Sequence, residues 1–122
     1  MLHHISFPVS DLPEAKAFYG AVLGALGYRI VAESSGFVGF GLVDNEDKFA
    51  LILAEPAIAA GRGFHLAFAA PSQEAVDRFH RAALAHGATD NGPPGLRPDY
   101  GPTYYAAFVI DLDGHRIEAV HK

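Results

Sequence analysis

The sequence contains no cysteine, which excludes disulfides, thiolate zinc sites and cysteine nucleophiles. It has no apolar run near the roughly 20 residues of a membrane-spanning helix, and its first residues lack the basic and then apolar segments of a secretory signal. Nine Lys and Arg stand against fourteen Asp and Glu, for a net charge of -5, and the basic residues form no stripe that would follow a nucleic-acid backbone. We therefore expect a cytoplasmic protein that binds neither nucleic acid nor membrane.

The 122 residues are half hydrophobic and about one-fifth charged, as in a single soluble domain with its own core. The sequence also repeats itself at an offset of 61 residues, half its length. The repeat is weak in identities but agrees in pattern, which favours a duplication. Over the first strand and helix of each half, the identical pairs in this register are His4 and His65, Phe7 and Phe68, Phe18 and Phe79, Ala21 and Ala82, and Leu23 and Leu84.

Each half is predicted to run strand, helix, then two or three antiparallel strands. Residues 2–9 alternate as a half-buried strand does. Asp11 and Glu14 are a capping pair that predicts a helix start, and Gly27 ends the apolar residues at helical spacing. Ser72 and Gly87 mark the same limits in the second half. Further strands are expected near 28–33, 36–43, 48–54, 64–69, 104–111 and 115–121.

These elements predict an α+β fold made of two βαβββ modules. We expect one domain over residues 1–122, with one module at about 1–60 and the other at about 61–122. The curved mixed sheets of the two modules would enclose a groove for a metal or another ligand. Small residues on the strand faces that point away from the helices leave room for that ligand.

Strand alternation places three potential metal ligands on the side of the sheets without helices. The apolar residues of strand 2–9 must face the helix, whose apolar stripe needs a partner surface, so His4 points away from it. The same argument turns His65 and Glu118 away from the helix. Two imidazoles and a carboxylate are a common set for a divalent metal. Three protein ligands leave positions open for water or substrate, as in catalytic sites.

The spacing of these three residues matches no compact metal motif. Taken singly, His4 is compatible with an ordinary sheet-face histidine, His65 with a core histidine and Glu118 with a surface carboxylate. Their common face, and the equivalent positions of the two histidines in the repeat, favour a metal site.

Three segments carry a resemblance to a known family: "LHHISFPVSDLPEAKAFYGAVLGALGY", "FHLAFAAPSQEAVDRFHRAALAHGA" and "YYAAFVIDLDGHRIEAV". They resemble the vicinal oxygen chelate superfamily, which includes glyoxalase I, fosfomycin-resistance transferases, extradiol dioxygenases and bleomycin-resistance proteins. The small glyoxalase-like proteins are the most similar subgroup. The resemblance implies paired βαβββ modules that curve round a metal, with His4, His65 and Glu118 on three of the family's metal positions. It also implies a homodimer whose modules pair within or between chains.

One position departs from glyoxalase I. Aligning the turn "DNED" of 44–47 with "DLDG" of 111–114 places Leu51 opposite Glu118. The resemblance assigns a glutamate there to metal binding and proton transfer, and leucine can do neither. We therefore expect a three-ligand site, Leu51 in the groove and poor glyoxalase activity. Glu55, four residues on, is the alternative fourth ligand.

The stretch "GATDNGPPGLRPDYGPTYY" is either a plain connection or a lid over the groove, since loops of this length are uncommon unless functional. As a lid it would bring Arg97 to an anionic substrate group and Tyr104 to a metal-bound oxygen as a hydrogen-bond donor. Tyr100 and Tyr105 would contact the substrate. Arg116 shares the face of Glu118 and would support the ligands or the substrate, or reach solvent.

The predicted function is that of an enzyme that depends on a divalent metal: Zn, Ni, Mn or Fe. The metal would act as a Lewis acid on vicinal oxygens of a small substrate, with Glu118 and Tyr104 as catalytic residues. Isomerase or lyase chemistry, thiol transfer and dioxygenase chemistry all remain open. The alternative is a metal-free protein of the bleomycin-resistance type that sequesters a small molecule.

Overall fold

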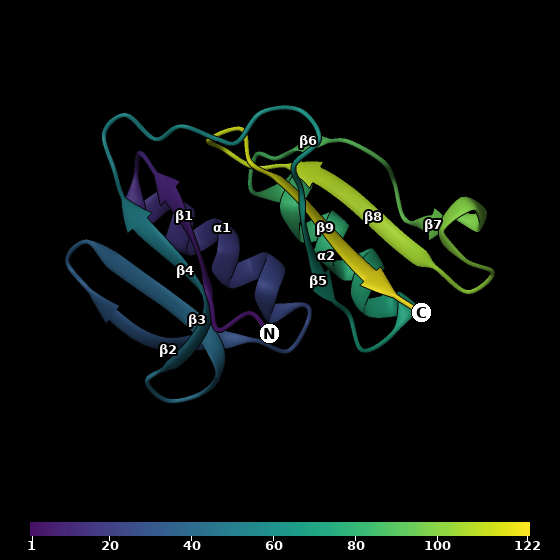
Figure 1. The fold of residues 1–122 in the computed structure, drawn as a ribbon, viewed down its shortest axis with the longest axis horizontal. Helices are drawn as coiled ribbons and strands as arrows, with labels where there is room; N and C mark the ends of the chain where they lie inside the picture. The colour runs from purple at the N-terminus through teal and green to yellow at the C-terminus, as the bar shows by residue number, and fades with distance from the viewer.

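The structure, a computed structural model, describes residues 1–122 as two βαβββ modules that lie side by side (Figure 1). The N-terminal module contains β1 (Ile5–Val9), α1 (Leu12–Gly24), β2 (Arg29–Ser34), β3 (Phe37–Val43) and β4 (Glu46–Leu53). The C-terminal module contains β5 (Leu66–Ala69), α2 (Gln73–Ala85), β6 (Thr89–Asp90), β7 (Gly95–Leu96), the 3-10 helix η1 (Pro98–Tyr100), β8 (Tyr105–Ile110) and β9 (Arg116–His121). The predicted α+β class is confirmed. Neither helix has the length and apolar character that crossing a membrane requires.

The two sheets have the same topology, as a duplication requires. Their strand orders are β1-β4-β3-β2 and β5-β9-β8-β6, and in each the first strand pairs in parallel with the last. All other pairs are antiparallel. The expected long connection before β8 is partly regular, because β6 and β7 both pair with β8 along its length.

Both helices begin at the predicted caps. The Asp11 carboxylate accepts a hydrogen bond from the Glu14 N–H at 2.9 Å, and the Ser72 hydroxyl accepts one from the Ala75 N–H at 3.1 Å. Each cap satisfies an N–H group that the first helical turn leaves without a partner. The apolar stripes of α1 and α2 then pack on their own sheets and join one hydrophobic core that runs through both modules.

A buried polar cluster joins the modules at the turn between β8 and β9. The Tyr19 hydroxyl of α1 donates to Asp111 at 2.5 Å, and Asp111 also accepts from the backbone N–H of His115 at 2.8 Å. The His115 imidazole donates through Nε2 to the Pro8 carbonyl at 2.7 Å and stacks on Phe7. Burial, reinforced by Asp111, raises the pKa of Tyr19 well above its usual value, so the phenol stays a neutral donor.

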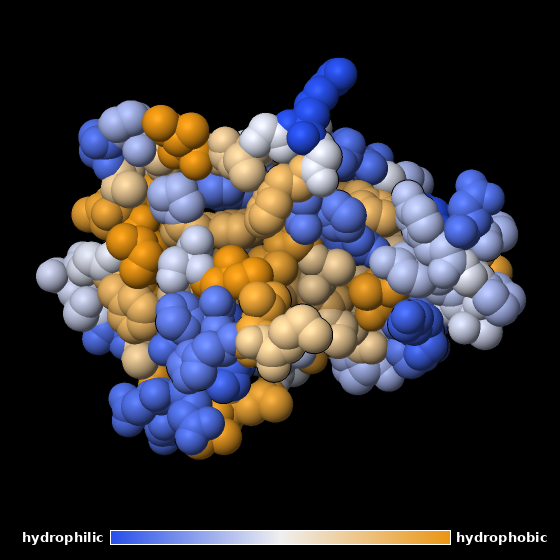
Figure 2. All heavy atoms as spheres, in the orientation of Figure 1, coloured by the Kyte–Doolittle hydropathy of each residue, from blue (hydrophilic) through white to orange (hydrophobic).

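This junction leaves the helix-free faces of both sheets open. Helices α1 and α2 pack against each other and lie behind the two sheets in the view of Figure 1. The sheets of a single chain therefore do not close round the expected groove, for which the resemblance leaves pairing within or between chains open. Figure 2 shows apolar side chains across the middle of this view, over the region where the two modules meet.

Candidate functional site

The pairing of β5 with β9 brings His65 and Glu118 together on the helix-free face of the C-terminal sheet. In this parallel register Ala67 lies beside Glu118, and His65 lies just before the start of β5. Its Nε2 is 2.9 Å from Glu118 Oε2. Tyr104, directly before β8, donates its hydroxyl proton to the other oxygen, Oε1, at 2.6 Å. The side chain of Glu118 is only 1 % exposed, whereas that of His65 is 51 % exposed.

Oxygen Oε2 of Glu118 is buried and accepts no hydrogen bond. His65 Nε2 is within ion-pair distance of it but lacks the alignment of a hydrogen bond. A buried carboxylate oxygen without a partner is costly. Two adjacent ligand atoms that each lie about 2.1 Å from one cation are about 3.0 Å apart in octahedral geometry and about 3.4 Å apart in tetrahedral geometry. The His65–Glu118 pair therefore fits two ligands of a divalent metal.

Tyr104 is held as a neutral hydrogen-bond donor beside this pair. Burial and then the hydrogen bond and charge of Glu118 raise the pKa of the Tyr104 phenol to about 12. Its hydroxyl therefore stays protonated at any physiological pH. Tyr100 of η1 places its ring edge-on to the Tyr104 ring, with centroids 5.3 Å apart.

The raised pKa of Tyr104 predicts a pH dependence of stability. The phenol has a higher pKa in the folded protein than in the unfolded chain. It therefore stabilises the fold fully at any pH below its pKa in the unfolded chain, which is about 10. This contribution is lost as the pH rises from 10 toward the folded value of about 12. The wild type should have a larger free energy of unfolding than Tyr104→Phe, and this difference should decrease as the pH rises over that interval. Urea unfolding at several pH values measures it, and an advantage that grows with pH would contradict the Tyr104–Glu118 hydrogen bond.

The third predicted ligand, His4, lies elsewhere in the single chain. It is exposed just before β1, with its Nδ1 2.8 Å from Nδ1 of His3. Both histidines line an apolar cavity of about 350 Å³ between the modules, with Ile5, Phe49 and Phe68. No three His, Cys, Asp or Glu side chains of the chain form a group that could hold a metal ion. One chain thus brings together two of the three predicted ligands.

The predicted position of Leu51 is wrong by one residue. In β4 Leu51 lies between Phe7 and Val38 in the hydrophobic core, on the helix side, and is 0 % exposed. The register pairs Ser6 with Ala50, as Ala67 pairs with Glu118, so Ala50 occupies the position equivalent to Glu118. The turn alignment fails because β3 and β4 shift register on both sides of Gly41. One shift leaves Lys48 of β4 without a partner and the other leaves Leu42 of β3 without one. The extra residue in β4 reverses the faces of the residues that follow it, so counting from the turn is wrong by one.

Tyr105 also faces the helix and not the predicted groove. Its hydroxyl donates to Asp77 of α2 at 2.7 Å, and this hydrogen bond raises the pKa of Tyr105. The reason is alternation: Tyr104 and Tyr105 are neighbours in an extended segment, so only one of them can face Glu118. Arg116 lies two residues before Glu118 in β9 and therefore on the same face, as predicted. Glu55 lies beyond the end of β4 and is exposed.

Sequence reasoning missed Phe108. This residue is the cross-strand neighbour of Glu118, and its ring centroid is 6.2 Å from that of His65. The guanidinium carbon of Arg97 lies 5.5 Å from the centre of the Phe108 ring. Alternation along strand 104–111 places Phe108 on the same face as Tyr104. This pattern in the sequence could therefore have identified Phe108 as a site residue.

The match to a family model extends over nearly the whole chain. Residues 1–119 match the Glyoxalase/Bleomycin resistance protein/Dioxygenase superfamily. The chain belongs to this superfamily. A relative in Bacillus subtilis, the uncharacterized protein YqjT, is 32% identical, with 98% of this chain and 97% of that protein covered.

Solved structures agree with the superfamily fold. A glyoxalase/bleomycin resistance protein from Albidiferax ferrireducens superposes with a TM-score of 0.84 at 33% identity and covers 98% of this chain and 97% of its own. The fosfomycin resistance protein FosX from Listeria monocytogenes superposes with a TM-score of 0.71 at 21% identity, with 98% and 91% covered. The second likeness shows the fold alone.

Proposed function

We propose that this member of the superfamily is a divalent-metal-dependent enzyme that acts on a small substrate with vicinal oxygens. The observation that carries the proposal is the buried oxygen of Glu118, which has no hydrogen bond and lies 2.9 Å from His65 Nε2. Burying a carboxylate in this way is costly unless a cation accompanies it. Zinc, nickel, manganese and iron all accept imidazole and carboxylate ligands.

We propose further that His4 of a second copy supplies the third ligand. The sheets of one chain lie side by side, so their open faces cannot enclose a metal between them. A twofold axis would place the N-terminal sheet of one copy, with its exposed His4, over the C-terminal sheet of the other. Twofold symmetry makes two such sites equivalent. The exposed side chain of Ile52 in β4 lies on the same helix-free face as Ala50 and would gain cover in a dimer.

Each residue at this proposed site would then have a distinct role. When bound, the metal would supply Lewis-acid polarisation of the substrate oxygens. His65 and Glu118 would hold it, and Tyr104 would orient Glu118 through the 2.6 Å hydrogen bond. The Tyr104 phenol is neutral because its pKa is about 12, and its one proton is held by Glu118. It could donate that proton to a substrate oxygen that gains negative charge only by giving up the hydrogen bond to Glu118. Ala50 offers no base at the position equivalent to Glu118, which supports poor glyoxalase activity.

Zinc titration of the wild type and single variants tests the metal site. Glu118→Gln and His65→Ala should each weaken zinc binding by at least about tenfold, since even outer groups that orient a ligand contribute that much. The affinity is measured by calorimetry on protein purified without a histidine tag. Binding should also weaken in acid, because protonated imidazole cannot be a ligand.

The matched control is His86→Ala, which removes an exposed histidine that only contacts its own helix, at the Ala82 carbonyl. It should leave zinc affinity unchanged. A wild type that binds no zinc would favour the metal-free protein that sequesters small molecules. Equal loss in all three variants would indicate non-specific binding of zinc to surface histidines.

A further inference from the structure

Arg97 is a half-buried cation without an acidic partner. The chain has fourteen Asp and Glu, yet none forms an ion pair with Arg97, whereas Lys16 and Arg29 both have one. Its guanidinium donates only to backbone carbonyls, to Pro93 at 2.5 Å and to Leu96 at 3.4 Å. A guanidinium has five N–H groups, so most of its donors have no partner within the chain.

The guanidinium lies beside the proposed metal site. It is 5.5 Å above the ring of Phe108, which is the cross-strand neighbour of Glu118 and contacts His65 edge-on. Arg97 therefore shares the helix-free face with the two metal ligands of the chain. An aromatic face attracts a cation but does not neutralise its charge.

Two glycines make room for this arrangement. A Cβ added at Gly92 would lie 3.3 Å from Nη2 of Arg97, and one at Gly95 would lie 3.1 Å from Nη1. Both contacts are tighter than ordinary Cβ contacts. Side chains at these positions would therefore push the guanidinium off Phe108.

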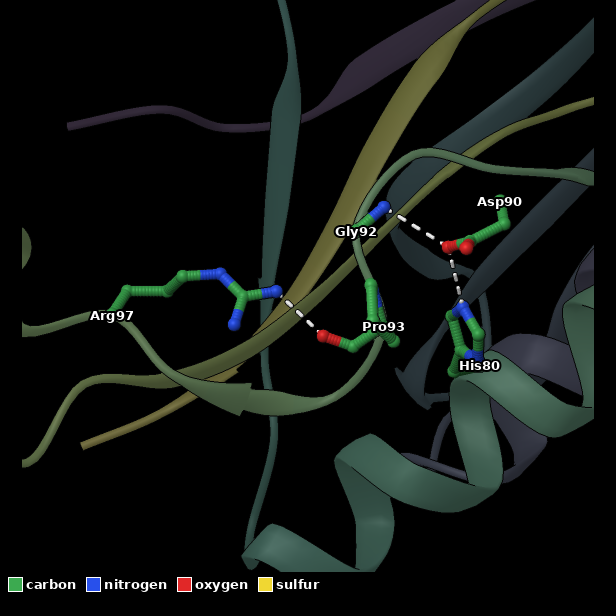
Figure 3. A network of polar contacts seen from close by, with 5 residues as sticks. All are labelled: His80, Asp90, Gly92, Pro93 and Arg97. Atoms are coloured by element: carbon green, nitrogen blue, oxygen red, sulfur yellow. Dashed lines mark hydrogen bonds and ion pairs between the residues drawn. The ribbon is translucent and has the colours of Figure 1, made fainter.

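The turn that holds Arg97 is itself fixed to α2, as Figure 3 shows. The Asp90 carboxylate accepts hydrogen bonds from His80 Nε2 at 2.9 Å and from the Gly92 N–H at 3.0 Å. The next residue, Pro93, offers its carbonyl to Arg97. The guanidinium is thus pre-organised, which lowers the entropy cost of binding a ligand.

We propose that Arg97 binds a carboxylate of the substrate. The substrate of the metal site is then a small molecule that carries a carboxylate in addition to its vicinal oxygens. A planar guanidinium with free, parallel N–H groups matches the two oxygens of a carboxylate. This assignment rests on the proposed metal site and adds the chemical class of its ligand.

The test compares two probes that share vicinal oxygens and differ in charge: 3,4-dihydroxybenzoate and its neutral isostere 3,4-dihydroxybenzamide. Calorimetry in the presence of zinc gives both affinities. The wild type should prefer the benzoate by at least about tenfold, the lower range for a charge-assisted hydrogen bond. In Arg97→Gln the two affinities should become equal, through loss of benzoate affinity alone.

Three further variants make the result specific. Arg81→Gln removes an exposed arginine of α2 and should keep the wild-type preference. Gly95→Ala keeps the charge of Arg97 but moves its guanidinium, so the preference should fall without loss of benzamide binding. Arg116→Gln tests the other arginine on this face. If the preference survives in Arg97→Gln, or is lost in Arg116→Gln in its place, the assignment is overturned.

The two proposals fail in different ways. Zinc-dependent binding of both probes with equal wild-type affinity would overturn the carboxylate assignment and leave the metal site intact. Absence of zinc-dependent binding for both probes would overturn the proposed function, and the carboxylate assignment with it.

Discussion

A mixture of His4→Ala chains and Glu118→Gln chains is expected to recover zinc binding of wild-type affinity, which neither variant has alone. If His4 of one copy joins His65 and Glu118 of the other, each mixed dimer contains one site with all three ligands and one site that lacks two of them. Random assortment makes about half of the dimers mixed, so about a quarter of the wild-type sites should return. Calorimetry after unfolding and refolding the variants together gives this stoichiometry.

The control mixture combines His65→Ala with Glu118→Gln. These two residues lie in the same module and belong to the same site, with 2.9 Å between their ligand atoms, so no combination of chains restores both. No sites should return in this mixture. Equal recovery in the two mixtures would contradict a metal site shared between two copies. Sedimentation of the wild type as a monomer at micromolar concentration would contradict it as well.

Leu51→Glu is expected to unfold the protein or to destabilise it by about 4 kcal/mol or more. Leu51 is 0 % exposed in the core between Phe7 and Val38, and no cation lies there to accompany a carboxylate. The substitution loses the packing of a buried leucine, about 2–5 kcal/mol in related changes, and buries a polar group without a partner. Urea unfolding monitored by circular dichroism measures the loss.

Ala50→Glu, one residue away, is expected to have the opposite outcome for metal binding. Ala50 faces away from the helix at the position equivalent to Glu118, on the same module as His4. Ala50 is only 1 % exposed, so a carboxylate there needs a cation beside it. As a fourth ligand in the dimer it should raise zinc affinity by tenfold or more, and the protein should keep its fold with zinc bound. If Leu51→Glu gained zinc affinity and Ala50→Glu unfolded, the register of β4 described here would be wrong.

Local rules were sufficient for most of the fold. Alternation predicted β1, the caps Asp11 and Ser72 predicted both helix starts, and the repeat predicted that the modules share one topology. These features depend on residues only a few positions apart, whose spacing is visible in the sequence. The faces of His65 and Glu118 followed from the same alternation, because each strand must turn its apolar side to its helix.

The sequence did not predict the pairing register of strands that contain a bulge. The register shifts around Gly41 moved Leu51 to the helix side and Ala50 to the face of the equivalent glutamate. A register shift of one residue turns every side chain of a strand to the opposite face. The sequence does not show where the register of β3 and β4 shifts. Tyr104 and Tyr105 show the same limit, since only the observed strand decides which of the two neighbours meets Glu118.

The sequence by itself determined the fold class, the duplication and the residue types of the site. Only the tertiary structure decided that the modules of one chain lie side by side, joined through Tyr19, Asp111 and His115. It thereby separated His4 from the His65–Glu118 pair and brought Arg97 over Phe108. The reason is physical: periodicity states which face of its own element a residue occupies, but contacts between distant segments depend on how whole modules pack.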